Sequence, residues 1–394
     1  MSKPSVAESF DPRSNSIGFI RWALAFVVIF SHAGPLAGFY GGRDLGTQWS
    51  EEQSFGGVAV GGFFFFSGYL ITQSRLGRSS TARYFWRRIL RIMPAFWTTF
   101  LFTAFVLAPI AFMRVNGSLD GFYTTENDNP FTYISNNMFL VLSQPSIAGL
   151  GPTLPYPNGI WNGSAWTLAY EFGAYIIVGV LGLIGALRHK IFAAIFAVVI
   201  LGLATLQWLR VGDLSFAGDL FTDFRVLLLL SPFVFGMLFA LFGDRIPLDG
   251  RVAAVALVIA ALTYGLGGWL VIGQYLFYYF LMWFAIRVTF LRNWEKPGDF
   301  SYGIYIFAWP IQQFVAYFGV HEWGWLAYHV IVVGIVHVLA FLSWHLVEKP
   351  AMSLKNWTPH WLVRVRAVTD PKAERLRAQL AQRLWPTDGG TTAR

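Results

Sequence analysis

Long apolar runs separated by short polar segments dominate the chain. A membrane-spanning helix needs about twenty predominantly apolar residues. On that criterion the pattern predicts spans at 18–38, 55–74, 92–113, 164–187, 191–210, 221–243, 251–272, 274–290, 300–320 and 323–347. The expected fold is therefore an all-α integral membrane protein with about ten transmembrane helices in one bundle.

The distribution of charged residues predicts the orientation of these spans. Segment 75–91 carries six arginines and no acidic residue, which places it in the cytoplasm by the positive-inside rule. Loops 39–54 and 114–163 carry more acidic than basic residues, so both fall outside. The longer of them, with five prolines and a short apolar part, is expected to be a partly ordered loop or a re-entrant element. Both termini then lie in the cytoplasm.

Three regions follow from this topology. Residues 1–17 form a cytoplasmic N-terminal leader, 18–350 the transmembrane domain, and 351–394 a basic cytoplasmic tail. Within the tail, leucines recur every fourth residue between arginines, at 376, 380 and 384. This spacing predicts an amphipathic helix lying on the inner leaflet.

Composition excludes several function classes. Hydrophobic residues make up 55% of the 394-residue chain and charged residues only 13%, which excludes a soluble globular domain. The chain has no cysteine, so thiol catalysis, disulfides and cysteine-ligated metal are excluded. The net charge of +8 lies mostly beside the membrane, which favours lipid contact over nucleic acid. His329, His337 and His345 are about 12 Å apart on one helix, too far to share a metal, so we expect packed or interfacial histidines and no metal site.

Two ionisable residues stand out in the first span. Arg21 and His32 are eleven residues apart, so they share a helix face and lie about 16 Å apart along the axis. Arg21 lies near the cytoplasmic mouth, where an arginine often serves only as a snorkelling anchor. His32 lies at depth, where a buried imidazole needs a partner, and this favours a functional residue.

A carboxylate enters the fourth span. Glu171 falls about two turns inside it, where a charge costs about 2.5–3.5 kcal/mol. A structural ion pair is one interpretation. The sharper hypothesis is that Glu171 meets His32 as a carboxylate–imidazole pair, in which His32 acts as general base.

The arginine segment has two interpretations as well. Such clusters usually serve topology and anionic lipid headgroups. However, Arg88 and Arg91 stand three apart on one helical face, where they could clamp a phosphate. Upstream, Ser67 and Gly68 interrupt an aromatic run and allow close backbone approach to a ligand or another helix.

Together these motifs resemble the membrane acyltransferase-3 family of bacterial integral-membrane O-acyltransferases. Those enzymes act on polysaccharides, glycolipids, peptidoglycan and some macrolides. The resemblance covers about residues 17–350, in the order that the family shows. It rests on Arg21-x10-His32, "FFFFSGYLI" (63–71), "RYFWRRILRIMPAFW" (83–97), "WTLAYEFGAY" (166–175), "SYGIYIFAWPIQQ" (301–313) and "VEKP" (347–350).

The resemblance implies a bundle in a bacterial inner membrane. It would pass an acyl group, commonly acetyl, from cytoplasmic acyl-CoA to a hydroxyl of a carbohydrate, glycolipid or related acceptor at or beyond the outer face. His32 and Glu171 are then the expected catalytic residues. The expected donor-binding residues are Arg21, Arg88, Arg91, Ser67 and Tyr302.

Two departures from the family pattern matter. Many relatives carry a second histidine where this chain has Ala308, which argues against a two-histidine mechanism. Some relatives carry an extracytoplasmic hydrolase-like domain that this chain lacks, so it works directly or with a separate extracytoplasmic partner.

Other functions stay open from the sequence. External aromatic residues could stack on sugar rings or form an interfacial belt; they are Trp49, Tyr156, Trp161 and Trp166. A proton-coupled transporter or flippase of lipid-linked sugars would use His32 and Glu171 as a proton relay. A non-catalytic scaffold would tolerate apolar residues at Arg21, His32 and Glu171.

Overall fold

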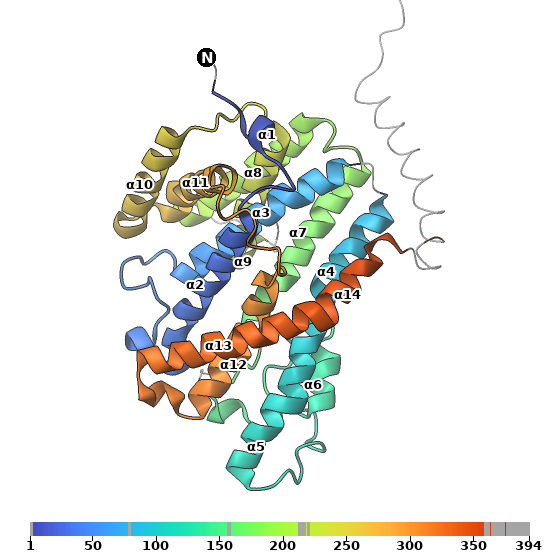
Figure 1. Cartoon of the computed structure of the whole chain (residues 1–394), viewed down its shortest axis with the longest axis vertical. Coiled ribbons are helices and arrows are strands. Elements are labelled where there is room, and N and C mark those ends of the chain that lie inside the picture. The colour runs from blue at the N-terminus through green and yellow to red at the C-terminus, as the bar shows by residue number, and fades with distance from the viewer. Residues whose placement is uncertain are drawn as a thin grey trace, which may run out of the picture.

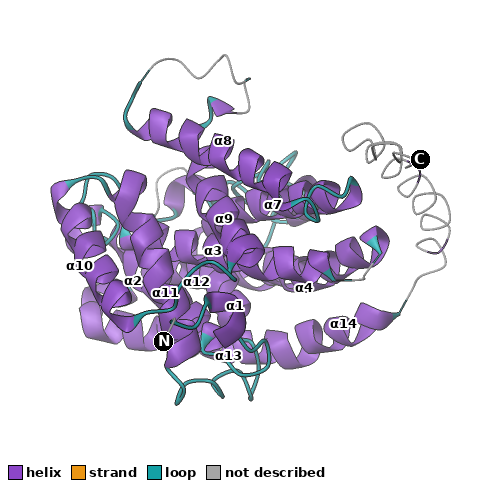
Figure 2. Ribbon diagram, turned by 90° about the horizontal axis from the view of Figure 1, so that it is seen from above, coloured by secondary structure: helices purple, strands orange, loops and turns teal. Residues whose placement is uncertain are grey.

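The chain folds as a bundle of helices (Figures 1 and 2). The structure is a computed structural model that describes residues 3–77, 80–155, 159–211, 218, 221–357, 363 and 375. Regular structure in this part of the chain is helical, apart from one isolated β-bridge between Ser5 and Pro247. The amphipathic helix predicted around residues 376–384 lies outside the described residues.

The helices follow one another in a simple order. Their bounds are α1 Val6–Ser9, α2 Ile17–Ala37, α3 Phe55–Leu76, α4 Thr81–Phe102, α5 Ala108–Asn116, α6 Pro130–Asn137, α7 Trp166–Leu183, α8 Lys190–Trp208, α9 Phe224–Phe242, α10 Gly250–Leu266, α11 Gln274–Arg287, α12 Ser301–Tyr317, α13 Trp325–Ser343 and α14 Lys349–Ser353. Wider π-helical turns continue three of them, at Thr103–Leu107, Trp269–Gly273 and Trp344–Glu348.

Every predicted span has a helix. Eight helical stretches in the described residues are long and apolar enough to cross a membrane. The other two predicted spans correspond to α10 and α12, each of 17 residues, at the short end of the range for a span. The prediction of an all-α, multi-pass membrane protein is confirmed.

Polar residues at the chain's turns fix where the helices begin and end. The Ser54 side chain accepts a hydrogen bond from the Gly57 amide at the start of α3. Asp249 caps the start of α10 in the same way. The end of α2 is set by Gly38, whose φ of 76° is the left-handed conformation that glycine adopts without strain.

The arginine-rich segment is mostly helical rather than a loop. Ser80 caps α4, so the predicted span 92–113 begins too late: the continuous helix runs over 36 residues, Thr81–Asn116. Arginine is a good helix former, and the first turns of α4 place it beside apolar residues on an amphipathic surface. A hydropathy criterion ends a span at the first charges, whereas the helix itself continues.

Two glycines let α3 and α9 touch backbone to backbone. A Cβ at Gly68 would lie 1.9 Å from the Phe233 carbonyl oxygen. On the facing helix, a Cβ at Gly236 would lie 2.0 Å from the Phe65 carbonyl oxygen. The expected close approach at Gly68 is therefore an approach to another helix.

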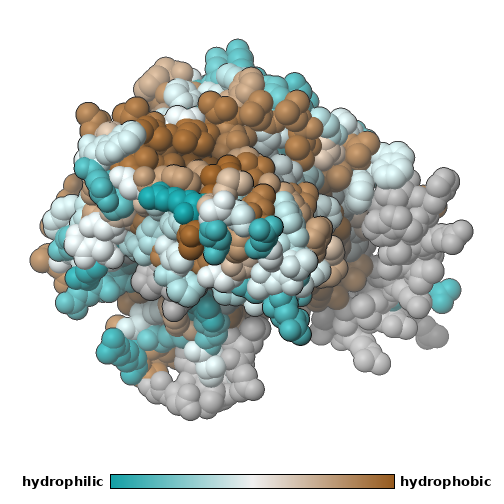
Figure 3. All heavy atoms as spheres, turned by 90° about the horizontal axis from the view of Figure 1, so that it is seen from below, coloured by the Kyte–Doolittle hydropathy of each residue, from teal (hydrophilic) through white to brown (hydrophobic). Residues whose placement is uncertain are grey.

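The molecular surface carries large apolar areas. On the face drawn in Figure 3, brown apolar side chains cover broad areas and teal hydrophilic side chains gather in separate patches. Large hydrophobic residues that are at least half exposed occur on α8, α10 and α13; examples are Val198, Val258 and Val330. Such a surface suits lipid rather than water.

The bundle has two chemically different ends. At the histidine end, which we define by His32 and Asp44, loop 39–54 folds back over the end of α2. At the arginine end, defined by Arg21, Arg88 and Arg91, the loop between α11 and α12 meets α4 through Asp299. Segments predicted on opposite sides of the membrane thus lie at opposite ends of the bundle.

Candidate active site

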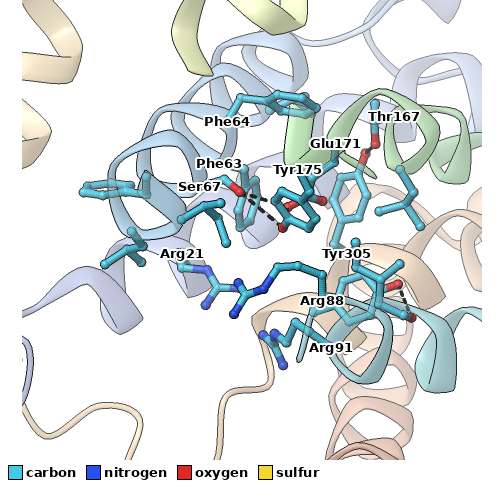
Figure 4. A pocket seen from close by; sticks show the side chains of 17 residues that line it. Arg21, Phe63, Phe64, Ser67, Arg88, Arg91, Thr167, Glu171, Tyr175 and Tyr305 are labelled. Carbon is cyan, nitrogen blue, oxygen red and sulfur yellow. Dashed lines mark hydrogen bonds between the residues drawn. The ribbon is translucent and has the colours of Figure 1, made fainter. Parts of the chain in front are cut away.

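A cavity of about 130 Å³ opens between α2, α3, α4, α7 and α12 (Figure 4). Its wall combines aromatic and aliphatic side chains with a few charged and hydroxyl groups. Six of the seven predicted site residues line it: Arg21, Ser67, Arg88, Arg91, Glu171 and Tyr302. The seventh, His32, is not among the lining residues; it packs against Trp309, one turn beyond Tyr305, which lines one end of the cavity.

Two of the three arginines at the arginine end are already paired. Arg21 lies 2.9 Å from Asp299, and Arg91 pairs with the same carboxylate and with Glu348, 3.4 Å away. The Ser301 hydroxyl donates a further hydrogen bond to Asp299 at 2.7 Å. Burial opposes ionisation of Asp299, but the charges of Arg21 and Arg91 outweigh it and hold the pKa of that carboxyl well below its usual range.

Sequence reasoning missed both acidic partners. Asp299 and Glu348 lie 278 and 257 residues from Arg21 and Arg91 respectively. Both stand in or beside motifs that the sequence had singled out, "SYGIYIFAWPIQQ" and "VEKP". A search for acidic residues in and directly beside these motifs would have identified them as candidate partners for the arginines.

Arg88 differs from its two neighbours. Its guanidinium stands over the rings of Tyr84 and Tyr175, 6.0 and 5.8 Å from their centres. Within the described residues it has no ion pair, and its Nε is buried without a hydrogen-bond partner. Of the three cavity arginines, Arg88 therefore has the charge most available to an anionic ligand.

Three hydrogen-bonding side chains cluster on the wall of the cavity that α3 and α7 form (Figure 4). The Ser67 hydroxyl donates to Oε1 of Glu171 at 3.2 Å, and the Tyr175 hydroxyl donates to the same oxygen. Ser67 also lies 3.3 Å from the Tyr175 hydroxyl. α3 and α7 bring the three groups together, so a serine, a carboxylate and a phenol face the same space.

The catalytic histidine candidate has a different carboxylate partner from the one predicted. His32 Nδ1 lies 2.8 Å from Oδ1 of Asp44. The Ser31 hydroxyl donates to the same oxygen at 3.1 Å, and the ring of Trp309 packs edge-on with its centre 4.9 Å from that of the imidazole. The predicted pair between His32 and Glu171 is wrong.

Helix geometry explains the error. A Cβ at Gly56 would lie 3.5 Å from His32 Cε1, which places the start of α3 beside the histidine. Ser67 follows eleven residues later, so it lies about 16 Å further along the bundle, and Glu171 bonds to it. Between the two levels, the hydroxyls of Thr167 and Tyr305 lie 2.7 Å apart. The sequence gives the depth of a residue within its span only approximately, so it could not show that His32 and Glu171 lie at different heights in the bundle.

The pair with Asp44 organises the imidazole for proton transfer. A carboxylate at Nδ1 holds the proton on that nitrogen and leaves Nε2 free to accept another. The side chains of His32 and Asp44 are 19% and 31% exposed, so the pair is accessible. The sequence signal for Asp44 was an acidic residue shortly after the end of the first span.

Tyr302 supports the site through its ring. Its hydroxyl donates to the Ile92 carbonyl at 2.9 Å, so this group is bonded to the backbone. The Arg91 guanidinium stands 5.7 Å from the ring centre. Tyr302 therefore lines the cavity and holds an arginine in place.

The three histidines His329, His337 and His345 are packed, as expected. The ring of His329 stacks on Phe30 with centres 4.6 Å apart, and His337 accepts a hydrogen bond from the Trp22 indole at 3.1 Å. His345, in the π-helical turn that follows α13, packs against Phe341 with ring centres 4.1 Å apart. In the described part of the chain, no group of three potential ligands could hold a metal ion.

Comparison with known proteins identifies the family of the chain. The family described as an acyltransferase domain matches residues 14–345. An O-acetyl transferase of Shigella phage Sf6 is 29% identical over 86% of this chain and 96% of its own length. Nodulation protein 10 of Rhizobium leguminosarum bv. viciae is 27% identical over 87% and 94%. Acyltransferase MdmB of Streptomyces mycarofaciens is 25% identical over 42% and 38%.

No solved structure matches the chain significantly. The family match covers nearly the whole chain, and the relatives of the chain include a protein named as an O-acetyl transferase. The chain therefore belongs to the membrane acyltransferase-3 family, and it is a multi-pass membrane acyltransferase.

Proposed function

We propose that the protein transfers an acyl group, most simply acetyl, from cytoplasmic acyl-CoA to a hydroxyl of a carbohydrate, glycolipid or related acceptor. The single observation that carries this proposal is the His32–Asp44 pair at 2.8 Å, which lies just beyond the end of a cavity that begins at arginines. An imidazole oriented by a carboxylate is the arrangement that a general base for a hydroxyl requires.

The arginine end supports binding of the donor's phosphates. Arg88 offers a guanidinium that has no ion pair within the described residues, and it lines the cavity beside Arg21 and Arg91, whose charges Asp299 and Glu348 balance. Arg21 and His32 are about 16 Å apart along α2, a span suited to an extended pantetheine arm. The thioester would then reach past Tyr305 and Trp309 to His32.

The chemical step uses groups already described. His32 Nε2 takes the proton of the acceptor hydroxyl while that oxygen bonds to the thioester carbonyl carbon. The carbon–sulfur bond then breaks, and CoA leaves as a thiolate that recovers the proton from the imidazolium. The products are an O-acyl ester and free CoA, and Asp44 stabilises the imidazolium between the two proton transfers.

Sidedness and location are part of the proposal. Positive residues gather at the arginine end, which supports a cytoplasmic position for both termini and for the donor site in a bacterial inner membrane. The histidine end then faces the acceptor on the outside. The acyl group passes directly to that acceptor or to a separate extracytoplasmic transferase.

Purified protein in detergent tests the proposal. Acetyl-CoA binding and thiol release are measured for the wild type, Arg88→Ala and His32→Ala. We expect Arg88→Ala to lose binding and His32→Ala to keep binding but lose thiol release. A folded wild type that binds no acyl-CoA would overturn the donor assignment and favour a transporter.

A further inference from the structure

One oxygen of Glu171 has no hydrogen bond from the part of the chain that the structure describes. Ser67 and Tyr175 both donate to Oε1. Oε2 receives no hydrogen bond from any residue that the structure describes, although the side chain lines the cavity. A carboxylate oxygen accepts hydrogen bonds, and Glu171 lines the cavity, so Oε2 can accept a hydrogen bond from a ligand there.

The position of this oxygen narrows the kind of ligand. Arg88 stands over Tyr175, one helical turn beyond Glu171 on α7. In the other direction, Thr167 lies one turn before Glu171 and bonds to Tyr305, close to the histidine end. Each turn spans about 5.4 Å, so Glu171 lies midway between the arginine charge and the end of the cavity nearest His32.

The middle of an acyl-CoA donor carries two amides, which separate the phosphates from the thioester. Each amide offers one N–H donor and one carbonyl acceptor. A carboxylate oxygen accepts an amide N–H in a charge-assisted hydrogen bond, and a hydroxyl donates to an amide carbonyl. The cavity presents both groups side by side, in Glu171 and Ser67.

We propose that Glu171 and Ser67 form a subsite for the pantetheine amides: Oε2 of Glu171 accepts an amide N–H, and the Ser67 hydroxyl turns to donate to an amide carbonyl. Tyr175 keeps its hydrogen bond to Oε1 and holds the carboxylate in place. The inference rests on the proposed use of acyl-CoA. It assigns Glu171 to donor recognition instead of the catalytic role expected from the sequence.

The remaining groups of the site are consistent with this assignment. His32 already has Asp44 as its carboxylate, so the histidine does not need Glu171. Glu171 is also separated from His32 by the hydroxyl pair of Thr167 and Tyr305. A carboxylate at this depth contacts the arm of the donor rather than the reacting atoms.

The experiment compares two probes that differ only in the amide-bearing arm. CoA carries the arm, whereas the ribose-phosphorylated ADP that forms its nucleotide half does not. Dissociation constants for both are measured with the purified full-length protein, as wild type, Glu171→Gln, Ser67→Ala and Arg88→Ala. Glutamine keeps the shape and can still accept from Tyr175, but it turns an N–H toward the ligand amide.

We expect Glu171→Gln to weaken CoA binding roughly tenfold or more, as loss of a charge-assisted hydrogen bond does, and to leave nucleotide binding unchanged. Ser67→Ala should show the same selectivity with a smaller loss. Arg88→Ala should weaken both probes. Tyr170→Phe, which removes a hydrogen bond to Asp223 from another face of α7, is the matched control and should change neither.

Two outcomes would overturn the inference. In the first, wild type binds CoA but Glu171→Gln binds it equally well, or weakens both probes alike; the subsite is then wrong while the proposed function stands. In the second, the wild type binds neither probe, and both fail together. Thermal unfolding of each variant shows that the protein is folded, and Ser67→Ala keeps the test open if Glu171→Gln does not fold.

Discussion

Asp44→Asn tests whether the carboxylate beside His32 contributes to catalysis. Asparagine keeps the size of the side chain but removes its charge. A hydrogen bond to a charged group contributes about 1.5–3 kcal/mol. Asp44 is 31% exposed, and water screens the pair, so the lower half of that range applies. Because 1.36 kcal/mol corresponds to a tenfold change in rate, kcat should fall about 10- to 45-fold.

Steady-state kinetics with acetyl-CoA provides the assay. KM for the donor should change little, since Asp44 lies at the opposite end of the bundle from the arginines. His32→Ala should lose more, on the order of 100-fold or beyond, because it removes the base itself. The double variant should be no slower than His32→Ala, since Asp44 acts only through the imidazole.

Asp120→Asn is the matched control, because the Asp120 carboxylate is exposed and, among the described residues, accepts a hydrogen bond only from the Ser118 hydroxyl. It should keep full activity. The reasoning is refuted if Asp44→Asn retains wild-type kcat, or if its effect adds in full to that of His32→Ala. Either result would mean that the 2.8 Å contact does not serve the reaction.

Three further predictions concern stability. Arg91→Ala should destabilise the fold by about 3–5 kcal/mol, because it removes an ion-pair partner from two carboxylates. Arg88→Ala should leave the thermal midpoint near that of the wild type. Equal thermal midpoints for the two variants would contradict the ion pairs of Arg91. Gly68→Ala should lower the free energy of unfolding by about 1–3 kcal/mol, because the new Cβ collides with the α9 backbone. Gly173→Ala should not lower it, because a Cβ there has no neighbouring atom within 4 Å. A Gly68→Ala variant as stable as the wild type would contradict the close approach of the two helices. Because the pKa of Asp299 is lowered in the folded protein, its carboxylate stabilises the fold above pH 3.8, its ordinary pKa, and this stabilisation is lost as the pH falls below that value. Asp299→Asn should therefore reduce the loss of thermal stability on acidification. An unchanged dependence of stability on pH below 3.8 would contradict the ion pairs of Asp299.

Much of the fold follows from local physics, which is why it could be predicted. An apolar run of about twenty residues in lipid has to be helical, because its backbone must satisfy its own hydrogen bonds. The start of α4 was missed for a related reason. The apolar stretch that defines the span ends at the arginines of 83–91. The helix continues through them, because arginine is a good helix former and Ser80 caps the start of the helix.

Within the site, the sequence predicted only the relative positions of residues on the same helix. Arg21 and His32 share a face because helix geometry alone relates them. The contact of His32 with Asp44 depends on how loop 39–54 returns over α2, and the contact of Arg91 with Glu348 joins segments 257 residues apart. Tertiary packing decides such contacts, and a single sequence contains no direct signal for them.

The most direct test of the central claim is ester formation by membranes that contain the protein. Inside-out vesicles receive radiolabelled acetyl-CoA, and alkali-labile label is counted in lipid and glycan extracts for the wild type and His32→Ala. The account predicts that the wild type incorporates label and that His32→Ala, present in equal amount, incorporates less than about one hundredth of it. Equal incorporation by the two proteins would contradict the role of His32 and with it the proposed mechanism.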